Sequence, residues 1–144
     1  MGSLRSGASG KIQGMGRPPI RAKTTNAPSI VVDLEWREGV FYLVLENHAQ
    51  TLMRDISVGF RRKIMGQGGQ VNISALPIWT KLHFMPPRKR IEVVVDRDAV
   101  FFAINRPGPV GVTVTYSDPD GVRWRGQLLI DFDAYRGFPD LRLR

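Results

Sequence analysis

One stretch, residues 40–60 (VFYLVLENHAQTLMRDISVGF), most constrains the fold, because apolar and polar residues alternate on both sides of a polar turn. The inward positions of the two halves are Phe41, Leu43 and Leu45, then Ile56, Val58 and Phe60. A period of two residues indicates half-buried antiparallel strands. The stretch therefore predicts a hairpin of two strands, each with one apolar face.

The same alternation recurs along most of the chain. It runs from Ile30 to Trp36, through Val71, Ile73 and Ala75, from Ile91 to Val95, from Val110 to Tyr116, and from Val122 to Phe132. Turn residues separate these runs, as at Glu38-Gly39, at Gly66–Gly69 and in Ser117-Asp118-Pro119-Asp120-Gly121. No segment shows a sustained helical period, and residues 100–104 are only a short apolar segment. This pattern predicts an all-β Greek-key sandwich of about seven or eight antiparallel strands, with a small barrel as the alternative.

The net charge of +8 is concentrated near the N-terminus. Residues 1–28 contain no acid and five basic residues, Arg5, Lys11, Arg17, Arg21 and Lys23. Their glycine, serine and proline content predicts a flexible arm, which is disordered alone or orders against a neighbour. The expected organisation is an arm over residues 1–28, a sandwich over residues 29–134 and a tail over residues 135–144, with Phe138 as a final anchor.

Composition limits the remaining possibilities. At 144 residues the chain is long enough for one domain with a buried core. It has no cysteine, which excludes disulfides and thiolate metal sites. No apolar run approaches the roughly 18 residues that span a bilayer, and the N-terminus lacks the apolar region of a signal peptide. The compartment stays open, and an envelope- or particle-associated location is compatible with the arm.

Three groups of residues carry a family resemblance. They are Leu45-Glu46-Asn47 followed by Asp55-Ile56-Ser57-Val58; Leu76-Pro77 with Pro86-Pro87 and Ile91-Glu92-Val93; and Tyr116-Ser117-Asp118 with Gly121 and Trp124. Together they resemble bacterial immunoglobulin-like domains of the cell-adhesion-related type, over about residues 30–133. The chain departs from that pattern at His48-Ala49 and at Pro87, where glycine is common. The resemblance implies an immunoglobulin-like sandwich and no particular activity, because this fold hosts many functions.

Candidate catalytic residues are few. His48 is expected in a solvated turn and His83 in a strand or at a sheet edge, and neither belongs to a cluster with metal-ligand spacing. The chain contains no nucleophile elbow, phosphate-binding loop or paired His-Glu motif. It is therefore predicted not to be an enzyme, with no catalytic, cofactor-binding or metal-binding residues.

Two aspartate pairs leave a cation site open. Asp118 and Asp120 share a turn, whereas Asp131 and Asp133 are expected on one strand face. Paired carboxylates can bind calcium or act in acid–base catalysis. Turn formation by the first pair and pairing of the second pair with outward arginines are the stronger explanation.

Basic runs are the remaining candidates for a site. They are Arg61-Arg62-Lys63, Arg88-Lys89-Arg90, and Arg123 with Arg125. Such clusters attract phosphate, although they also occur as solvated strand ends that guard sheet edges. Trp36 and Trp124 fall on apolar faces and are assigned to the core. Trp79, between prolines and outside a clean strand, is expected to be exposed, where it can contact a partner or a carbohydrate.

The sequence thus predicts a non-enzymatic protein–protein interaction module. We expect a structural or accessory subunit of a larger bacterial or viral assembly that docks through its N-terminal arm. The alternative is binding of nucleic acid or an anionic surface through the arm and the arginine clusters.

Overall fold

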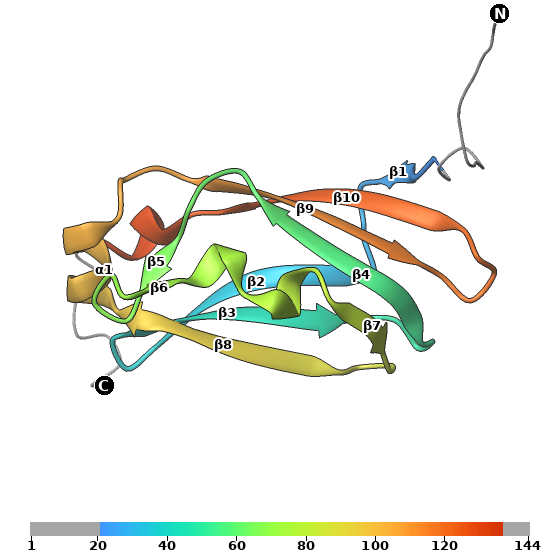
Figure 1. The fold of residues 1–144 in the computed structure, drawn as a ribbon, viewed down its shortest axis with the longest axis horizontal. Coiled ribbons are helices and arrows are strands. Elements are labelled where there is room, and N and C mark those ends of the chain that lie inside the picture. Colours follow the sequence, from blue (N-terminus) through green and yellow to red (C-terminus); the bar gives the residue numbers. More distant parts are fainter. Residues whose placement is uncertain (1–20, 137–144) are drawn as a thin grey trace, which may run out of the picture.

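The computed structural model describes residues 21–136 and shows a mostly β body in which two sheets face one another (Figure 1). The five-stranded sheet has the order β1-β10-β9-β4-β7, and the three-stranded sheet has the order β2-β3-β8. The strands are β1 (Lys23–Thr25), β2 (Ile30–Arg37), β3 (Val40–Asn47), β4 (Met53–Phe60), β7 (Leu82–Met85), β8 (Arg90–Arg97), β9 (Val110–Ser117) and β10 (Arg123–Ile130). The predicted all-β, sandwich-like class is confirmed.

Short elements complete the described chain. They are the paired strands β5 (Met65–Gly66) and β6 (Val71–Asn72), the helix α1 (Asp98–Ile104), and the 3-10 helices η1 (Ile73–Ala75), η2 (Pro77–Trp79) and η3 (Phe132–Tyr135). The arm residues Arg5, Lys11 and Arg17, and the predicted anchor Phe138, lie outside the described residues. No helix within residues 21–136 is both long and apolar enough to cross a membrane.

A single core fills the space between the two sheets, because each sheet turns alternate apolar side chains inward. Phe41, Leu43 and Leu45 of β3 are fully buried. Ile56 and Val58 of β4 face them from the other sheet and are also buried. The inward faces predicted from the alternation in residues 40–60 are confirmed.

The strand pairing predicted for residues 40–60 is wrong. β3 pairs with β2 and β8, whereas β4 pairs with β7 and β9 in the other sheet. The connection between β3 and β4 therefore crosses from one sheet to the other instead of closing a hairpin. Alternation reports which face of a strand is buried and carries no information about the neighbouring strand, which explains the error.

Two hairpins form at turn residues that were identified from the sequence. β2 and β3 are joined at Glu38-Gly39, where both residues have positive φ. β9 and β10 are joined through a turn that ends at Gly121, which has a φ of +82°. Positive φ is costly for side chains other than glycine, so the glycines mark these turns reliably.

The crossing between β3 and β4 is organised by one buried polar side chain. Asn47 is fully buried, and its side-chain nitrogen donates to the carbonyls of Thr51 at 2.9 Å, Met85 at 2.9 Å and Pro86 at 3.1 Å. Its side-chain oxygen accepts from the backbone nitrogen of Ala49 at 2.9 Å. The residue therefore ties the crossing to the start of the connection between β7 and β8.

The middle of the chain departs furthest from expectation. The run through Ile73 and Ala75 is a strand only at Val71–Asn72 and then becomes η1. Trp79 is 1% exposed, which corrects its predicted exposure. Its indole nitrogen donates to the Ile73 carbonyl at 2.7 Å, and its ring packs edge-on against Phe60. Pro77 begins the 3-10 helix η2 instead of a strand, and this turn directs Trp79 into the core.

Helix α1 and η3 close the other end of the core. Phe101 of α1 stacks against Phe132 of η3 at 4.2 Å between ring centroids, and both rings contact Phe41. Asp131 and Asp133 do not share a strand face as predicted, because Asp131 caps η3 by accepting from the Asp133 nitrogen at 3.0 Å. Helical turns this short are not visible as a sustained period in sequence.

Candidate functional site

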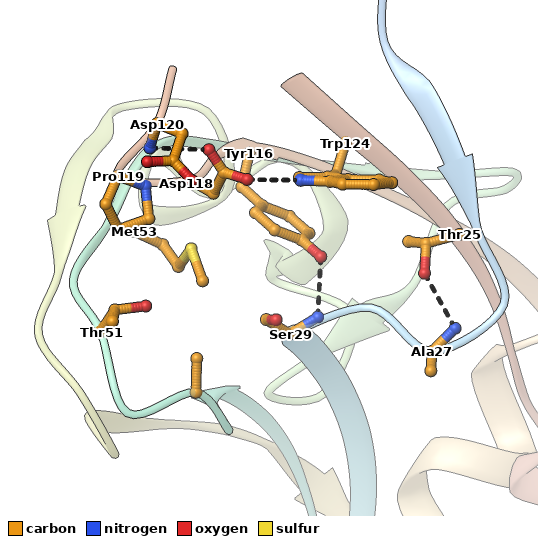
Figure 2. A pocket seen from close by; sticks show the side chains of 11 residues that line it. Thr25, Ala27, Ser29, Thr51, Met53, Tyr116, Asp118, Pro119, Asp120 and Trp124 are labelled. Carbon is orange, nitrogen blue, oxygen red and sulfur yellow. Dashed lines mark hydrogen bonds between the residues drawn. The ribbon is translucent and has the colours of Figure 1, made fainter. Parts of the chain in front are cut away.

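An open pocket of about 530 Å³ lies at one end of the sandwich (Figure 2). Three segments that are distant in sequence form its walls: the connection from β1 to β2, the crossing from β3 to β4, and the turn from β9 to β10. Small and hydroxyl-bearing residues line the first two walls, among them Thr25, Ala27, Ser29 and Thr51. Loops gathered at one end of a sandwich are the usual place for recognition on this architecture.

Two aromatic side chains fix the shape of the pocket. Tyr116 is almost fully buried, and its hydroxyl oxygen accepts from the backbone nitrogen of Ser29 at 2.8 Å. This bond attaches the start of β2 to β9 of the opposite sheet. Trp124 is half-buried on β10, and its indole nitrogen donates to Asp118 Oδ2 at 2.9 Å. Figure 2 shows the Tyr116 ring between the Asp118 turn and Ser29, and the Trp124 ring beside Asp118 on the side of Thr25.

Two carboxylates stand on the rim. Asp118 Oδ1 accepts from the backbone nitrogens of Asp120 and Val122, each at 2.9 Å, so the side chain holds the β9–β10 turn. The indole bond from Trp124 and these backbone bonds lower the pKa of Asp118, which keeps it ionised. Asp120 is exposed, and within residues 21–136 its carboxylate accepts no hydrogen bond and forms no ion pair. The two groups give the rim a negative charge.

The aspartate pair does not form a metal cluster with other described side chains. Within residues 21–136, no group of three or more histidine, cysteine, aspartate or glutamate side chains is placed to hold a metal ion. The Asp118 carboxylate is instead used by the turn and the indole.

One predicted arm residue, Lys23, lies beside the Trp124 wall of this pocket without lining it. β1 pairs in parallel with β10, which places Lys23 opposite Trp124 in the sheet register. The Lys23 ammonium lies 6.0 Å from the centroid of the indole ring, within cation–π range. Its charge also contributes to the lowered pKa of Asp118. Arg21, two residues earlier, is exposed.

The first two of the three predicted basic runs lie far apart in the fold. Arg61, Arg62 and Lys63 follow the last residue of β4, whereas Arg88, Lys89 and Arg90 precede or begin β8 at the opposite end of the body. Arg62 donates to the carbonyls of Arg106 at 3.3 Å, Pro107 at 3.0 Å and Gly108. It therefore supports the loop before β9 rather than offering a free charge.

The second cluster is also used internally. Arg90 forms ion pairs with Glu35 at 2.6 Å, Glu92 at 2.9 Å and Glu46 at 3.5 Å across the three-stranded sheet. The hydrogen bonds to Glu35 and Glu92 raise the pKa of Arg90. Arg88 donates to the His48 carbonyl at 3.3 Å. Lys89 is exposed.

The strands of the two sheets differ in net charge, and this difference cannot be seen from the order of residues in the sequence. The strands of the five-stranded sheet carry four basic residues and one acid, namely Lys23, Arg54, Arg123 and Arg125 with Asp55. The strands of the three-stranded sheet carry five acids and three basic residues, namely Asp33, Glu35, Glu46, Glu92 and Asp96 with Arg37, Arg90 and Arg97. The strands of one sheet thus carry a net positive charge and those of the other a slight net negative charge.

Both histidines are exposed. His48 follows β3 and lies 3.4 Å from Glu46, and His83 lies on edge strand β7, 3.8 Å from Asp55. Their predicted positions in a solvated turn and on an edge strand are confirmed.

Sequence reasoning missed the pocket although it named most of its parts. Trp124 was assigned to the core. Asp118 and Asp120 were assigned to the turn, and the structure has both aspartates in that turn. The missing information was the parallel pairing of β1 with β10 and the crossing of the chain near Thr51, which together bring three walls into contact. A signal was present in the short spacing of Tyr116, Asp118, Asp120 and Trp124 around one turn.

The fold and the pocket define a small, mostly β domain with an open pocket between loops at one end. Residues 17–136 match the model of a family described as a domain of unknown function, DUF8453, and the chain belongs to this family. No curated protein and no solved structure matches the chain.

Proposed function

We propose that this chain is a non-enzymatic protein–protein interaction module on an immunoglobulin-like Greek-key sandwich, serving as a structural or accessory subunit of a larger assembly. The strand order supports the fold. β2, β3 and β8 correspond to strands A, B and E, and β10, β9 and β4 to strands G, F and C. One strand is placed differently from a constant-type domain. β7 pairs with β4, the counterpart of strand C, whereas the remaining strand of a constant-type domain, strand D, pairs with strand E.

The observation that carries the interaction role is the pocket at the end where the N-terminal segment enters. It combines an aromatic wall, hydroxyl groups and a charged rim, which are the components of a peptide-binding surface. The polar atoms of Tyr116 and Asp118 already hold structural bonds, so they serve to keep the pocket rigid. Lys23 belongs to the predicted arm of residues 1–28, and it lies in β1 at this end of the body.

Cross-linking of assemblies isolated with the full-length chain tests the proposal. Lys23 lies at the pocket end and Lys63 at the opposite end, and both are exposed, so they form a matched pair of reporters. We expect lysine-reactive cross-links to another subunit through Lys23 and not through Lys63. Intermolecular links through Lys63 alone, or no intermolecular links, would contradict the proposal.

The charge division supports a second function, binding of nucleic acid or an anionic surface through the five-stranded sheet. Arg123 lies across the outer face of this sheet, where it donates to the Asp55 carbonyl at 2.7 Å and to Thr115 Oγ1 at 3.2 Å. Gly59 leaves the same face open. A salt titration with a labelled DNA duplex and with anionic vesicles separates this function from the first. Two results favour the second function: affinity that falls steeply with rising salt, and a lower affinity in the R125Q variant.

A further inference from the structure

The pocket at the end of the sandwich has a chemistry that selects its occupant. Its volume of about 530 Å³ is in the range of pockets that take small ligands or single side chains with their backbone. Its rim carries Asp118 and Asp120, and neither carboxylate forms an ion pair with any side chain in residues 21–136. Lys23 acts on Asp118 and offsets part of this charge. The two carboxylates and Lys23 together still leave a net negative charge, which favours a cationic occupant over an anionic one.

The indole of Trp124 also favours a positively charged occupant. An aromatic face attracts guanidinium and ammonium groups, and Lys23 already lies 6.0 Å from this ring. Because the indole nitrogen is bonded to Asp118, the ring is held in one orientation beside the carboxylate. A cation in the pocket would therefore meet a ring face and a carboxylate that are fixed before it arrives, which reduces the entropy cost of binding.

The remaining walls suit a peptide backbone. The hydroxyl groups of Ser29 and Thr51 have no hydrogen-bond partner among the described residues and lie on opposite sides of the pocket (Figure 2). Ala27 and Ala49 add small apolar surface to the lining. An extended segment can thus bond to the walls while one of its side chains points toward Trp124.

We propose that this pocket binds an extended peptide segment through one arginine or lysine side chain, seated between the Trp124 ring and the Asp118–Asp120 rim. This inference rests on the proposed function and names the chemistry of the partner at that site. The N-terminal sequence of the chain itself supplies a suitable probe, because residues 1–20 contain Arg5, Lys11 and Arg17 and no acid.

The three tryptophans make the test specific. Trp124 donates to Asp118 in the pocket, Trp79 donates to the Ile73 carbonyl in the core, and Trp36 donates to Asp98 Oδ2 at 3.0 Å near α1. Their indole N–H signals in a nitrogen-15 correlation spectrum therefore report three separate places. A ligand in the pocket is expected to shift the Trp124 signal and to leave the Trp79 signal unchanged.

The titration uses the full-length chain carrying R5Q, K11Q and R17Q, so that its own N-terminal residues do not compete. The first probe is a peptide with the sequence of residues 1–20, and the second is the same peptide with its three basic residues replaced by glutamine. We expect the first peptide to shift the Trp124 signal and to bind about tenfold more tightly than the second, which corresponds to about 1.4 kcal/mol.

Two pocket variants complete the experiment. D120K places a positive charge on the rim without removing a side-chain bond, and D33K makes the same charge reversal on the outer face of the three-stranded sheet. We expect D120K to weaken binding of the basic peptide about tenfold and D33K to change it less than twofold. Equal binding of the two peptides, no shift of Trp124, or equal losses in both variants would overturn the inference.

The outcome is separable from that of the proposed function. A chain that cross-links to a neighbour through Lys23 but shows no response of Trp124 to the basic peptide refutes the pocket assignment alone. A chain that makes no intermolecular contact at that end refutes the proposed function on which the assignment rests.

Discussion

The side-chain nitrogen of Asn47 donates to the main-chain carbonyl of Met85 at 2.9 Å, inside the body and between two connections that are 38 residues apart in sequence. The same nitrogen serves the carbonyls of Thr51 and Pro86. One amide therefore organises the crossing of the chain between sheets, next to the pocket wall at Thr51.

Replacement of Asn47 by alanine should lower the free energy of unfolding by about 2–4 kcal/mol, because it removes the side-chain donor from the buried Met85 carbonyl and from the part-buried carbonyls of Thr51 and Pro86. Urea unfolding followed by circular dichroism measures the change. His48→Ala, at the next and exposed position, is the control and should stay within about 0.5 kcal/mol of the wild type. Similar losses for both variants would show that Asn47 holds no special role.

Gly66 and Gly59 offer a second matched pair. A Cβ at Gly66 would clash with the Val95 carbonyl oxygen and lie 2.7 Å from Ile73 Cγ1, whereas a Cβ at Gly59 would meet no atom within 4 Å. Gly66→Ala should therefore cost about 2–3 kcal/mol of unfolding free energy through overpacking. Gly59→Ala should be neutral or slightly stabilising, by up to about 1 kcal/mol, because it restricts the unfolded chain. Denaturant midpoints of the two variants test this order, and the reverse order would contradict the packing around Gly66.

The Asp118 turn should make stability depend on acid pH. Because the pKa of Asp118 is lowered in the folded protein, its ionised form stabilises the fold above the unfolded pKa of about 3.9. That contribution is lost as pH falls through the lower folded pKa. Asp118→Asn should thus reduce the melting temperature at pH about 7, and the difference from wild type should shrink at pH about 2.

Asp120→Asn is the control for that experiment, since its carboxylate bonds to no side chain or backbone group in residues 21–136. It should leave the melting temperature nearly unchanged at both pH values. A deficit of Asp118→Asn that is equally large in acid would show that the charge of Asp118 is not what stabilises the turn.

The ion pairs of Arg90 should stabilise the three-stranded sheet in a salt-dependent manner. Arg90 contacts Glu35, Glu46 and Glu92, so Arg90→Gln leaves three carboxylates near one another with less compensating charge. We expect a lower melting temperature at about 10 mM salt and a smaller decrease at about 0.5 M salt, where exposed charges are screened.

Arg125→Gln is the counterpart on the cationic sheet. Arg125 is exposed and forms no ion pair with any residue from 21 to 136. Its removal should leave the melting temperature unchanged or slightly higher at low salt. Equal and salt-independent effects of the two substitutions would contradict the electrostatic division of the sheets.

The sequence predicted the eight-residue strands because alternation and turn residues are local signals. Ile30–Trp36 and Val110–Tyr116 were recognised from their own side chains, and the structure has β2 and β9 there. Pairing is a long-range property, so the partners of β3 and β4 and the parallel contact of β1 with β10 were not accessible. Trp79 was misplaced because its surroundings, Ile73 and Phe60, are supplied by tertiary packing.

The candidate site was predictable only in part for the same reason. Lys23 was singled out by charge, and the pocket includes the turn residues Asp118 and Asp120 beside it. Arg62 and Arg90 were singled out equally, yet the fold uses both as internal donors. Charge clusters in a sequence do not reveal which side chains find carbonyls or carboxylates after folding.

The unequal charges of the two sheets give the body a permanent electric dipole along the normal to its layers. Packed sheets are about 10 Å apart, so the excess positive charge of the five-stranded layer is displaced from the acidic layer by roughly that distance. Within a Debye length of about 8–10 Å, the resulting torque turns the molecule before any contact forms. Near a negatively charged surface, this dipole would favour the orientation in which the five-stranded sheet faces the surface and the carboxylates of the three-stranded sheet face away from it.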